Sequence, residues 1–338
     1  MHLSLQQLFL LALVTSFVVA YIATPQVRRL ALKVGVLDVI DERRMHGADP
    51  KPRIGGVAVF LGLASALFVT IGFALHTPLF HRAGDTQDFF GLLFGSTLIM
   101  LVGVWDDIMG MRPRNKFLAQ VVVAVISMVY GFHIPGFAIP GTERYVSLPF
   151  WIDYPVTLVW YLGMMNAINF LDGLDGLLSG VTAISGLFLF AIASSHGNVG
   201  ASLVLCALIG GSLGFLPYNF NPAKIILGDT GSLFIGYVFA TVSLLITAKI
   251  AVTVSLLVPL VALALPVVDT AVAIFRRIRA GKAITEADRG HFHHVLVFQF
   301  GLNVKQAVLL IYAVCFLLGA AAYLLSGSAG HARLPGVI

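Results

Sequence analysis

The sequence predicts an all-α, polytopic membrane protein of about ten transmembrane helices, with a functional site on one membrane face. Hydrophobic residues make up 58% of the chain and charged residues only 11%, and the mean hydropathy is +0.94. Soluble domains carry roughly a quarter charged residues. Apolar runs of about 20 residues, the length of a membrane-spanning helix, recur along the sequence. We expect one integral-membrane domain over residues 1–338.

Ten apolar runs are candidate spans. The first run is too long for the core of a signal peptide and has no basic segment before it, so we expect it to remain in the membrane. Cys206 and Cys315 both fall inside spans, where packing is the expected role. A turn-rich connection with three prolines is predicted at 135–153. The predicted spans are 4–24, 54–75, 88–105, 117–134, 155–170, 177–195, 201–217, 231–248, 251–274 and 306–326.

Basic residues predict the orientation of these spans. Alternating crossings place 17 of the 21 Lys and Arg residues on one face, chiefly in the connections 25–53 and 275–305. The positive-inside rule makes that face cytoplasmic. A basic face also favours anionic lipids and phosphorylated small molecules.

Acidic residues end apolar runs on this same face. Asp106 and Asp107 close the third predicted span, and Lys116 follows them. A carboxylate at the bilayer centre costs roughly 2.5–3.5 kcal/mol, so acids beside lipid need a physical cause. They are either solvated charges at a helix end or paired carboxylates that hold a metal ion or a proton, with a cation nearby for phosphate.

A second polar group has residues three apart: Asn169, Asp172 and Asp175. If this segment is helical, the three side chains lie on one side and can face one ligand. Gly173 and Gly176 equally permit a turn between two spans. The loop contains no Lys or Arg to neutralise its acids, which favours a bound cation.

A third group precedes the eighth predicted span. Asn219, Lys224 and Asp229 share one short connection, and Thr230 follows Asp229. Asp229 or Thr230 is predicted to cap the helix that begins there. The N-terminus of such a helix would also favour a bound anion.

A histidine cluster, with Arg289 beside it, follows the ninth predicted span. His291, His293 and His294 could ligate zinc, but no Cys is nearby. A clamp that donates hydrogen bonds to phosphate oxygens fits this basic loop better. A solvated loop beside the membrane is the plainer alternative.

Two other acids are assigned no chemistry. Asp269, inside the ninth predicted span, is expected to pair with Arg276 or Arg277. Asp38 lies outside every motif, so its substitution is expected to matter less than that of His293 or His294.

Together, five segments resemble the polyprenyl-phosphate N-acetylhexosamine-1-phosphate transferase family. They are PRIGG at 52–56, WDD at 105–107 with Lys116, NAINFLDGLDG at 166–176, PYNFNPAKIILGDTGS at 217–232 and ADRGHFHH at 287–294. The segments occur in the family's order. DRGHFHH and LPVVDT look closer to the N-acetylglucosamine-type branch than to the phospho-N-acetylmuramoyl-pentapeptide transferase branch, which is the alternative.

The resemblance implies transfer of an N-acetylhexosamine 1-phosphate, with N-acetylglucosamine first, from a UDP-sugar to undecaprenyl phosphate. UMP is released and a cell-envelope glycan begins. Mg²⁺, with Mn²⁺ as a substitute, would be held by Asp229. The implied partners are the UDP-sugar donor, undecaprenyl phosphate and membrane lipids, and no nucleic acid. The resemblance does not decide between a monomer and a homodimer. The implied location is the bacterial inner membrane, with both termini periplasmic. Catalysis is assigned to Asp106, Asp107, Lys116, Asp172 and Asp175, and substrate binding to Lys51, Asn169, Asn219, Arg289, His291, His293 and His294.

One departure and two rivals accompany this resemblance. The family tends to place Phe where this chain has Ile226, so uracil stacking is not carried over. A CDP-alcohol phosphotransferase would need an Ala-Arg pair that does not follow the Asp172–Asp175 segment. An ion-coupled transporter would place its acids near the midplane of repeated halves, whereas here they end helices and no repeat is visible.

Overall fold

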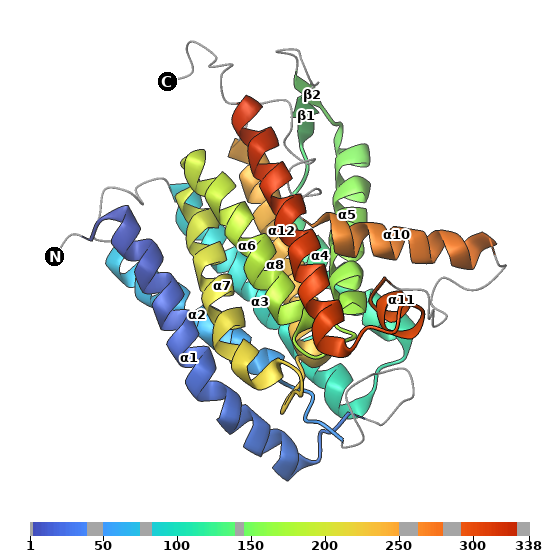
Figure 1. Ribbon diagram of the computed structural model, residues 1–338. Helices are drawn as coiled ribbons and strands as arrows, with labels where there is room; N and C mark the ends of the chain where they lie inside the picture. Colours follow the sequence, from blue (N-terminus) through green and yellow to red (C-terminus); the bar gives the residue numbers. More distant parts are fainter. Residues whose placement is uncertain are drawn as a thin grey trace.

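The computed structural model is a bundle of long helices with one short β-hairpin (Figure 1). It describes residues 3–38, 50–74, 83–138, 145–249, 263–279 and 292–329. Its helices are α1 Leu5–Val34, α2 Gly56–Ala74, α3 Ala83–Met109, α4 Pro113–Val129, α5 Phe150–Leu171, α6 Leu177–Ser195, α7 Val199–Asn219, α8 Gly228–Lys249, α10 Ala264–Arg279, α11 Phe292–Phe298 and α12 Val304–Ala329. The hairpin pairs β1, Gly136–Ala138, with β2, Tyr145–Ser147.

Seven helices of the described part of the chain are long and apolar enough to cross a membrane: α1, α2, α3, α6, α7, α8 and α12. The chain is therefore an all-α polytopic membrane protein, as the composition predicts. The number ten for the crossings stays a prediction, since α4, α5 and α10 are not among these seven.

Helix α1 continues ten residues beyond the predicted end of the first span. It starts at a capping box in which the Ser4 and Gln7 side chains each accept the other residue's backbone N–H, an arrangement that satisfies N–H groups without helical partners. Buried Val27 and Ala31 extend the apolar face at helical spacing. The helix ends at Gly35, whose φ of 78° suits glycine.

Helices α7 and α8 form the centre of the bundle. α7 packs against α1, α2 and α6, and α8 packs against α3 and α5. α12 packs on α6. The polar groups buried between α4, α5 and α8 bond to one another: the Ser127 hydroxyl lies 2.8 Å from that of Tyr237, and the Tyr161 hydroxyl lies 3.1 Å from that of Thr241. These four hydroxyl groups, removed from water, thus find partners in one another.

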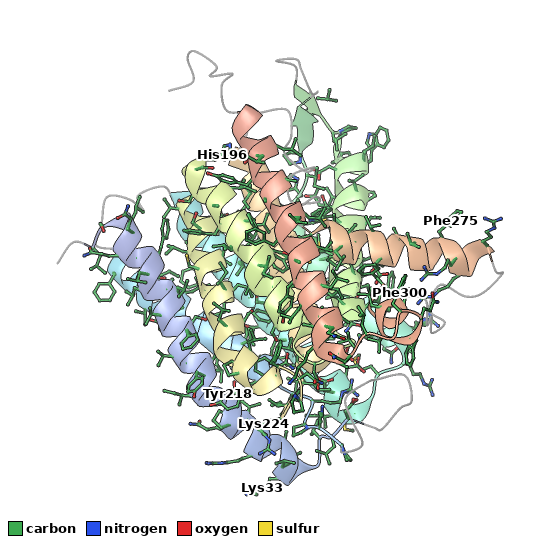
Figure 2. All side chains as sticks on the ribbon, in the orientation of Figure 1. Lys33, His196, Tyr218, Lys224, Phe275 and Phe300 are labelled. Carbon is green, nitrogen blue, oxygen red and sulfur yellow. The ribbon has the colours of Figure 1, made fainter. Side chains whose placement is uncertain are left out.

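Several helix ends meet at one end of the bundle, which we call the acidic end because it contains Asp106, Asp107 and Asp229. α3, α5 and α7 finish there, and α4, α6 and α8 begin there. Figure 2 shows Lys33 and Lys224 at this end and His196 at the other. The start of α1, the end of α12 and the hairpin also lie at the other end (Figure 1).

The connection predicted to be turn-rich at 135–153 contains the hairpin and the first turn of α5. Asp153, in that turn, is 4% exposed. Its carboxylate lies 2.6 Å from His133 Nδ1 and accepts a bond from Thr157, whose hydroxyl in turn accepts Ile134 N–H. These bonds tie the base of the hairpin to α5 and begin that helix five residues earlier than predicted.

Helix α10 differs most from its prediction. Instead of ending at 274, it continues to Arg279, and Figure 1 shows it lying crosswise to the other helices and projecting from the side of the bundle. Sixteen residues of α-helix span about 24 Å, less than the roughly 30 Å of a bilayer core. Val268, Val272 and Phe275 are exposed along it. The rest of the predicted span, 251–262, lies outside the described residues.

Glycines allow α8 to approach its neighbours closely. A Cβ on Gly103 of α3 would lie 2.5 Å from Thr230 Cα, and a Cβ on Gly56 of α2 would lie 2.1 Å from Gly231 N. No larger residue fits at these crossings without backbone movement. Small residues serve the same purpose at many helix contacts within membranes.

We therefore expect Gly103→Ala to lower the free energy of unfolding by about 1–3 kcal/mol, because the added methyl group forces α3 away from α8. The melting temperature in detergent measures this. Gly72→Ala is the matched control, since a Cβ there meets nothing within 4 Å. Equal melting temperatures for the two variants would contradict the close contact.

Candidate active site

The acidic end is organised around the start of α8. The first N–H groups of any helix lack partners within it, and here a side chain of α3 supplies them. Asp107 Oδ1 accepts Asp229 N–H at 3.0 Å, and Asp107 Oδ2 accepts Thr230 N–H at 2.9 Å and the Thr230 hydroxyl at 2.7 Å. The predicted capping by Asp229 or Thr230 is wrong, because α8 begins at Gly228 and both residues lie inside its first turn.

Capping by Asp107 leaves the Asp229 carboxylate available to the site. Asp229 Oδ1 lies 2.9 Å from Lys116 Nζ and accepts a hydrogen bond from the Asn169 amide. Asn169 also donates to Ser232 Oγ at 2.7 Å. Groups from α4, α5 and α8 therefore converge on one carboxylate that is 13% exposed.

Asp106 and Lys116 complete this cluster. Asp106 Oδ2 lies 2.9 Å from Lys116 Nζ, and Asp106 Oδ1 accepts Met111 N–H at 2.7 Å. Burial alone would lower the pKa of Lys116, but the charges of Asp229 and Asp106 more than offset it and raise that pKa above its usual value. The ammonium therefore stays charged at neutral pH and bridges two carboxylates.

Arg53 belongs to the same cluster, although its place in PRIGG predicted no role for it. Its Nη2 lies 3.2 Å from Asp107 Oδ1 and 3.5 Å from Asp229 Oδ2. Burial opposes its charge, yet Asp107 and Asp229 outweigh that effect and raise the pKa of Arg53. The sequence did contain a sign of this role: Arg53 directly precedes an apolar span, and a charge beside the membrane needs a partner.

The backbone around Arg53 is held on both sides. Arg53 N–H donates to Val36 O at 3.3 Å, and Asp38 N–H donates to Lys51 O at 2.7 Å. On the other side, Ile226 N–H donates to Pro52 O at 2.9 Å. The carboxylate of Asp38 also lies 3.7 Å from Arg53 Nε, so Asp38 is part of this region. The expectation that substitution of Asp38 matters less than substitution of His293 or His294 stays a prediction.

Asn169, Asp172 and Asp175 do not face one ligand together. α5 ends at Leu171, and Gly176, with φ of 80°, precedes α6. The turn directs Asn169 to Asp229, whereas Asp175 is buried against Lys51 Nζ at 3.0 Å. Asp175 also accepts bonds from the Asn221 amide and Ala223 N–H. A turn was one of the two possibilities left open by Gly173 and Gly176.

Asn219 and Ile226 face the protein interior. The Asn219 amide donates to Ile225 O at 3.1 Å and accepts from Ser179 Oγ at 2.8 Å. The Ile226 side chain is 3% exposed. Both residues hold the turn between α7 and α8, and Lys51 with Asp175 anchors its other side.

The histidine cluster is described only in part. Arg289 and His291 lie outside the described residues, as do the side chains of His293 and His294. α11 is anchored by its first residue, since Phe292 N–H donates to Asp269 Oδ1 at 2.9 Å. Asp269 thus has a backbone partner that the sequence did not indicate.

The cluster fits a divalent cation that takes few protein ligands. Among the described residues, no group of three His, Cys, Asp or Glu side chains forms a metal cage. Mg²⁺ usually takes one or two carboxylates and completes its shell with water and substrate phosphate. Asp229 and Asp106 can serve in this way. Asp107 already accepts four donors, which fills both oxygens.

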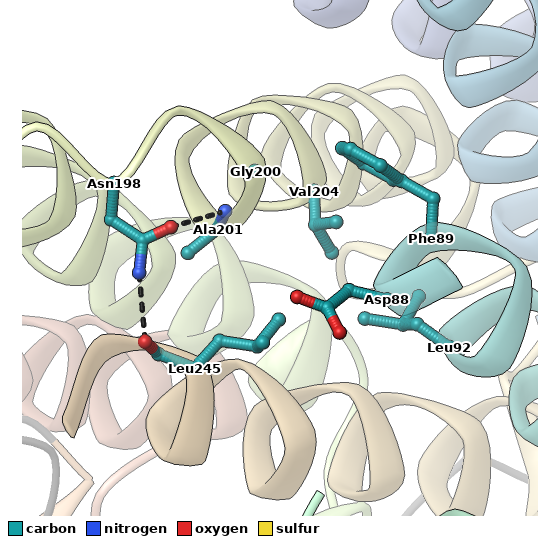
Figure 3. Close-up of a pocket in the computed structure, with 8 residues that line it drawn as sticks. All are labelled: Asp88, Phe89, Leu92, Asn198, Gly200, Ala201, Val204 and Leu245. Atoms are coloured by element: carbon teal, nitrogen blue, oxygen red, sulfur yellow. Dashed lines mark hydrogen bonds between the residues drawn. The ribbon is translucent and has the colours of Figure 1, made fainter. Parts of the chain in front are cut away.

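Two cavities lie away from this cluster. One, of about 10 Å³, has room for a single water between the start of α3, the start of α7 and the end of α8 (Figure 3). Its Asn198 is occupied by bonds to Ala201 N–H and Leu245 O. The other, of about 470 Å³, is an apolar groove along α10, lined in part by Val268, Val272 and Leu318.

Known membrane transferases match most of this chain. Residues 89–247, from α3 to α8, match the model of glycosyl transferase family 4. A probable undecaprenyl-phosphate N-acetylglucosaminyl 1-phosphate transferase of Bacillus subtilis is 35% identical over 317 residues, 94% of this chain and 85% of that protein. A decaprenyl-phosphate N-acetylglucosaminephosphotransferase of Mycolicibacterium smegmatis is 33% identical, covering 91% and 79%. A phospho-N-acetylmuramoyl-pentapeptide-transferase of Staphylococcus aureus is 32% identical, covering 71% and 76%.

The fold and the site therefore define a membrane-embedded transferase with a charged site at one end of a helical bundle. The chain belongs to glycosyl transferase family 4, the family of the polyprenyl-phosphate sugar-1-phosphate transferases named above. This confirms the resemblance seen in its five sequence segments.

The two adjacent aspartates should respond differently to substitution. Asp107→Asn removes acceptors from the start of α8 and should cost about 1–3 kcal/mol of stability, because buried donors lose their partner. Asp106→Asn should melt closer to the unaltered protein, since Asp106 accepts one backbone bond and one cation. Thermal unfolding of both variants in detergent makes the comparison. A larger loss for Asp106→Asn would contradict the capping role of Asp107.

Proposed function

We propose that this chain transfers N-acetylglucosamine 1-phosphate from UDP-N-acetylglucosamine to undecaprenyl phosphate, releasing UMP. The observation that carries the proposal is the cluster of Asp106, Asp229, Lys116 and Arg53 at the acidic end. Phosphoryl transfer depends mainly on positioning and on neutralising charge. A cluster that offers both carboxylates for a cation and cations for phosphate suits that chemistry.

Three residues of the cluster, Asp229, Asp106 and Lys116, have tasks in this proposal. Bound Mg²⁺, with Mn²⁺ as a substitute, would polarise the diphosphate and stabilise the leaving UMP. Asp229 and Asp106 would hold it. Lys116 would neutralise charge on the transferring phosphate. Asp106, freer than Asp107, would accept a proton from the acceptor phosphate or orient it. The acceptor phosphate would attack the donor phosphorus directly. The sequence is equally compatible with a covalent aspartyl-phosphate route, for which Asp107 is unsuited because both of its oxygens are engaged.

The apolar groove along α10 favours a lipid as the acceptor substrate. Its walls present Val268, Val272 and Leu318 at the outside of the bundle, a surface suited to an isoprenoid chain. The far end of α10 is joined to the site region, because the Arg277 guanidinium lies 5.5 Å from the centre of the Phe170 ring, next to Asn169. A chain in this groove would bring its phosphate toward α5.

The same geometry favours a transferase over an ion-coupled transporter. Exposed Trp105 lies at the acidic end and exposed Trp151 at the other end. Indole side chains concentrate at membrane–water interfaces, so these residues mark the two borders of the membrane. The acids then lie at an interface, where a soluble sugar nucleotide and a lipid can meet, rather than at the midplane.

The donor test uses purified full-length protein, undecaprenyl phosphate and Mg²⁺, with UMP as the readout. UDP-N-acetylglucosamine should release UMP. Release from UDP-N-acetylmuramoyl-pentapeptide alone would move the chain to the other branch. Release from neither donor, nor from a UDP-N-acetyl-6-deoxyhexosamine, would overturn the proposed reaction.

Two aspartate variants control this test. Asp229→Asn should lose at least about 100-fold in turnover, since an amide is a poorer Mg²⁺ ligand than a carboxylate. Asp88→Asn makes the same chemical change at the opposite end of the bundle and should keep normal turnover.

The proposed location is the inner membrane of a bacterium, with the acidic end cytoplasmic and both termini periplasmic. Reporter fusions at position 40 and position 285 should therefore read cytoplasmic, and a fusion after residue 338 periplasmic. The 17 of 21 basic residues on the acidic side motivate this orientation. Opposite readings at positions 40 and 285 would contradict it.

A further inference from the structure

Arg53 lies among more negative charge than it can neutralise. Its guanidinium contacts the carboxylates of Asp107, Asp229 and Asp38, at 3.2, 3.5 and 3.7 Å. Asp106 adds a fourth negative charge to its surroundings. Lys116 contacts two of these acids, Asp106 and Asp229. Arg53 therefore shares its charge among several carboxylates and does not pair with a single one.

The position of Arg53 is set by its main chain. Backbone bonds hold residues 51–56 between 36–38 on one side and 226–227 on the other. The carbonyl oxygen of Arg53 also lies against Gly228, where a Cβ would come within 2.0 Å of it. The backbone is therefore fixed beside the start of α8, and only the long side chain retains freedom to change partners.

The contacts of Arg53 are unequal. Asp107 is held by three donors from α8 in addition to Arg53, so its carboxylate does not move. The contact with Asp229 is longer, at 3.5 Å against 3.2 Å. Asp229 is also the carboxylate best placed to bind a divalent cation. A cation arriving there would compete with Arg53 for the same negative charge.

We propose that Arg53 is a further functional residue of this site: it neutralises Asp229 until a divalent cation binds, and then turns its guanidinium toward a phosphate oxygen of the donor. Arginine suits the second task because its planar N–H groups match phosphate oxygens in pairs. Asp38 and Asp107 keep the side chain in place during the exchange. The phosphate contact rests on the proposed function, whereas the exchange with the cation does not.

The first experiment needs no substrate. Thermal unfolding of the purified full chain is followed while Mg²⁺ is added. Arg53→Gln should melt at a lower temperature than the unaltered protein without Mg²⁺, because its acids repel one another. Its melting temperature should also reach half of the Mg²⁺-induced increase at an Mg²⁺ concentration about tenfold lower than in the unaltered protein, because the positive charge beside Asp229 is gone.

Two further variants define the comparison. Arg53→Lys keeps the charge but not the fork of donors, so its Mg²⁺ midpoint should stay within about threefold of the unaltered protein. If Arg53→Gln does not fold, a midpoint of Arg53→Lys that differs more than about threefold from that of the unaltered protein would overturn the exchange. Arg29→Gln removes a charge from an exposed position on α1 and should change neither the melting temperature nor the midpoint. An unchanged or raised Mg²⁺ midpoint in Arg53→Gln would overturn the exchange.

The second experiment measures UMP release at saturating Mg²⁺. Arg53→Gln and Arg53→Lys should both raise the KM for the UDP-sugar, by about tenfold for the glutamine variant, with a smaller change in kcat. An unchanged donor KM would overturn the phosphate contact. If no variant and no donor releases UMP, the proposed function fails, and the Mg²⁺ titration still decides whether Arg53 exchanges with a cation.

Discussion

The structure depends on one carboxylate, that of Asp107, placed against the free N–H groups of α8. A buried acid beside lipid is unfavourable unless its charge is paired and hydrogen-bonded. Asp107 meets that requirement with two backbone N–H groups, one hydroxyl and one guanidinium. In return it joins α3 to α8 at a fixed distance and angle. The glycines at this crossing allow the approach, and the placement of Asp229 follows from it.

The rest of the acidic end distributes charge so that no group stands alone. Lys116 forms ion pairs with Asp106 and Asp229, Arg53 with Asp107 and Asp229, and Lys51 with Asp175. These three cations come from two elements, α4 and the segment 51–53 before α2, while the acids come from α3, α8 and the turn before α6. A phosphorylated ligand would thus meet charges that are already oriented, which is what catalysis by charge neutralisation requires.

Sequence reasoning located most of this site because polar residues in an apolar chain are conspicuous. Asp106, Asp107, Lys116, Asn169 and Asp229 do converge. The different tasks of Asp106 and Asp107 could not be predicted from the sequence. Neighbours on a helix point about 100° apart, and only the position of α8 decides which of the two carboxylates caps it. The same holds for Arg53, whose partners are distant in sequence. The direction of α10 depends on packing against α5, which hydropathy does not report.

The bridge between Leu37 and Pro52 has a consequence for variation among related chains. It pairs the backbone on either side of residues 38–51, so the positions of Lys51 and Arg53 are set by this bridge and by the backbone bonds to 36–38 and 226–227. In general, the closure entropy between two fixed ends rises by only about 0.6 kcal/mol when the connecting length doubles. Evolution can therefore lengthen or shorten this stretch, and a protein engineer can insert an epitope there, while the cations beside α8 stay in register.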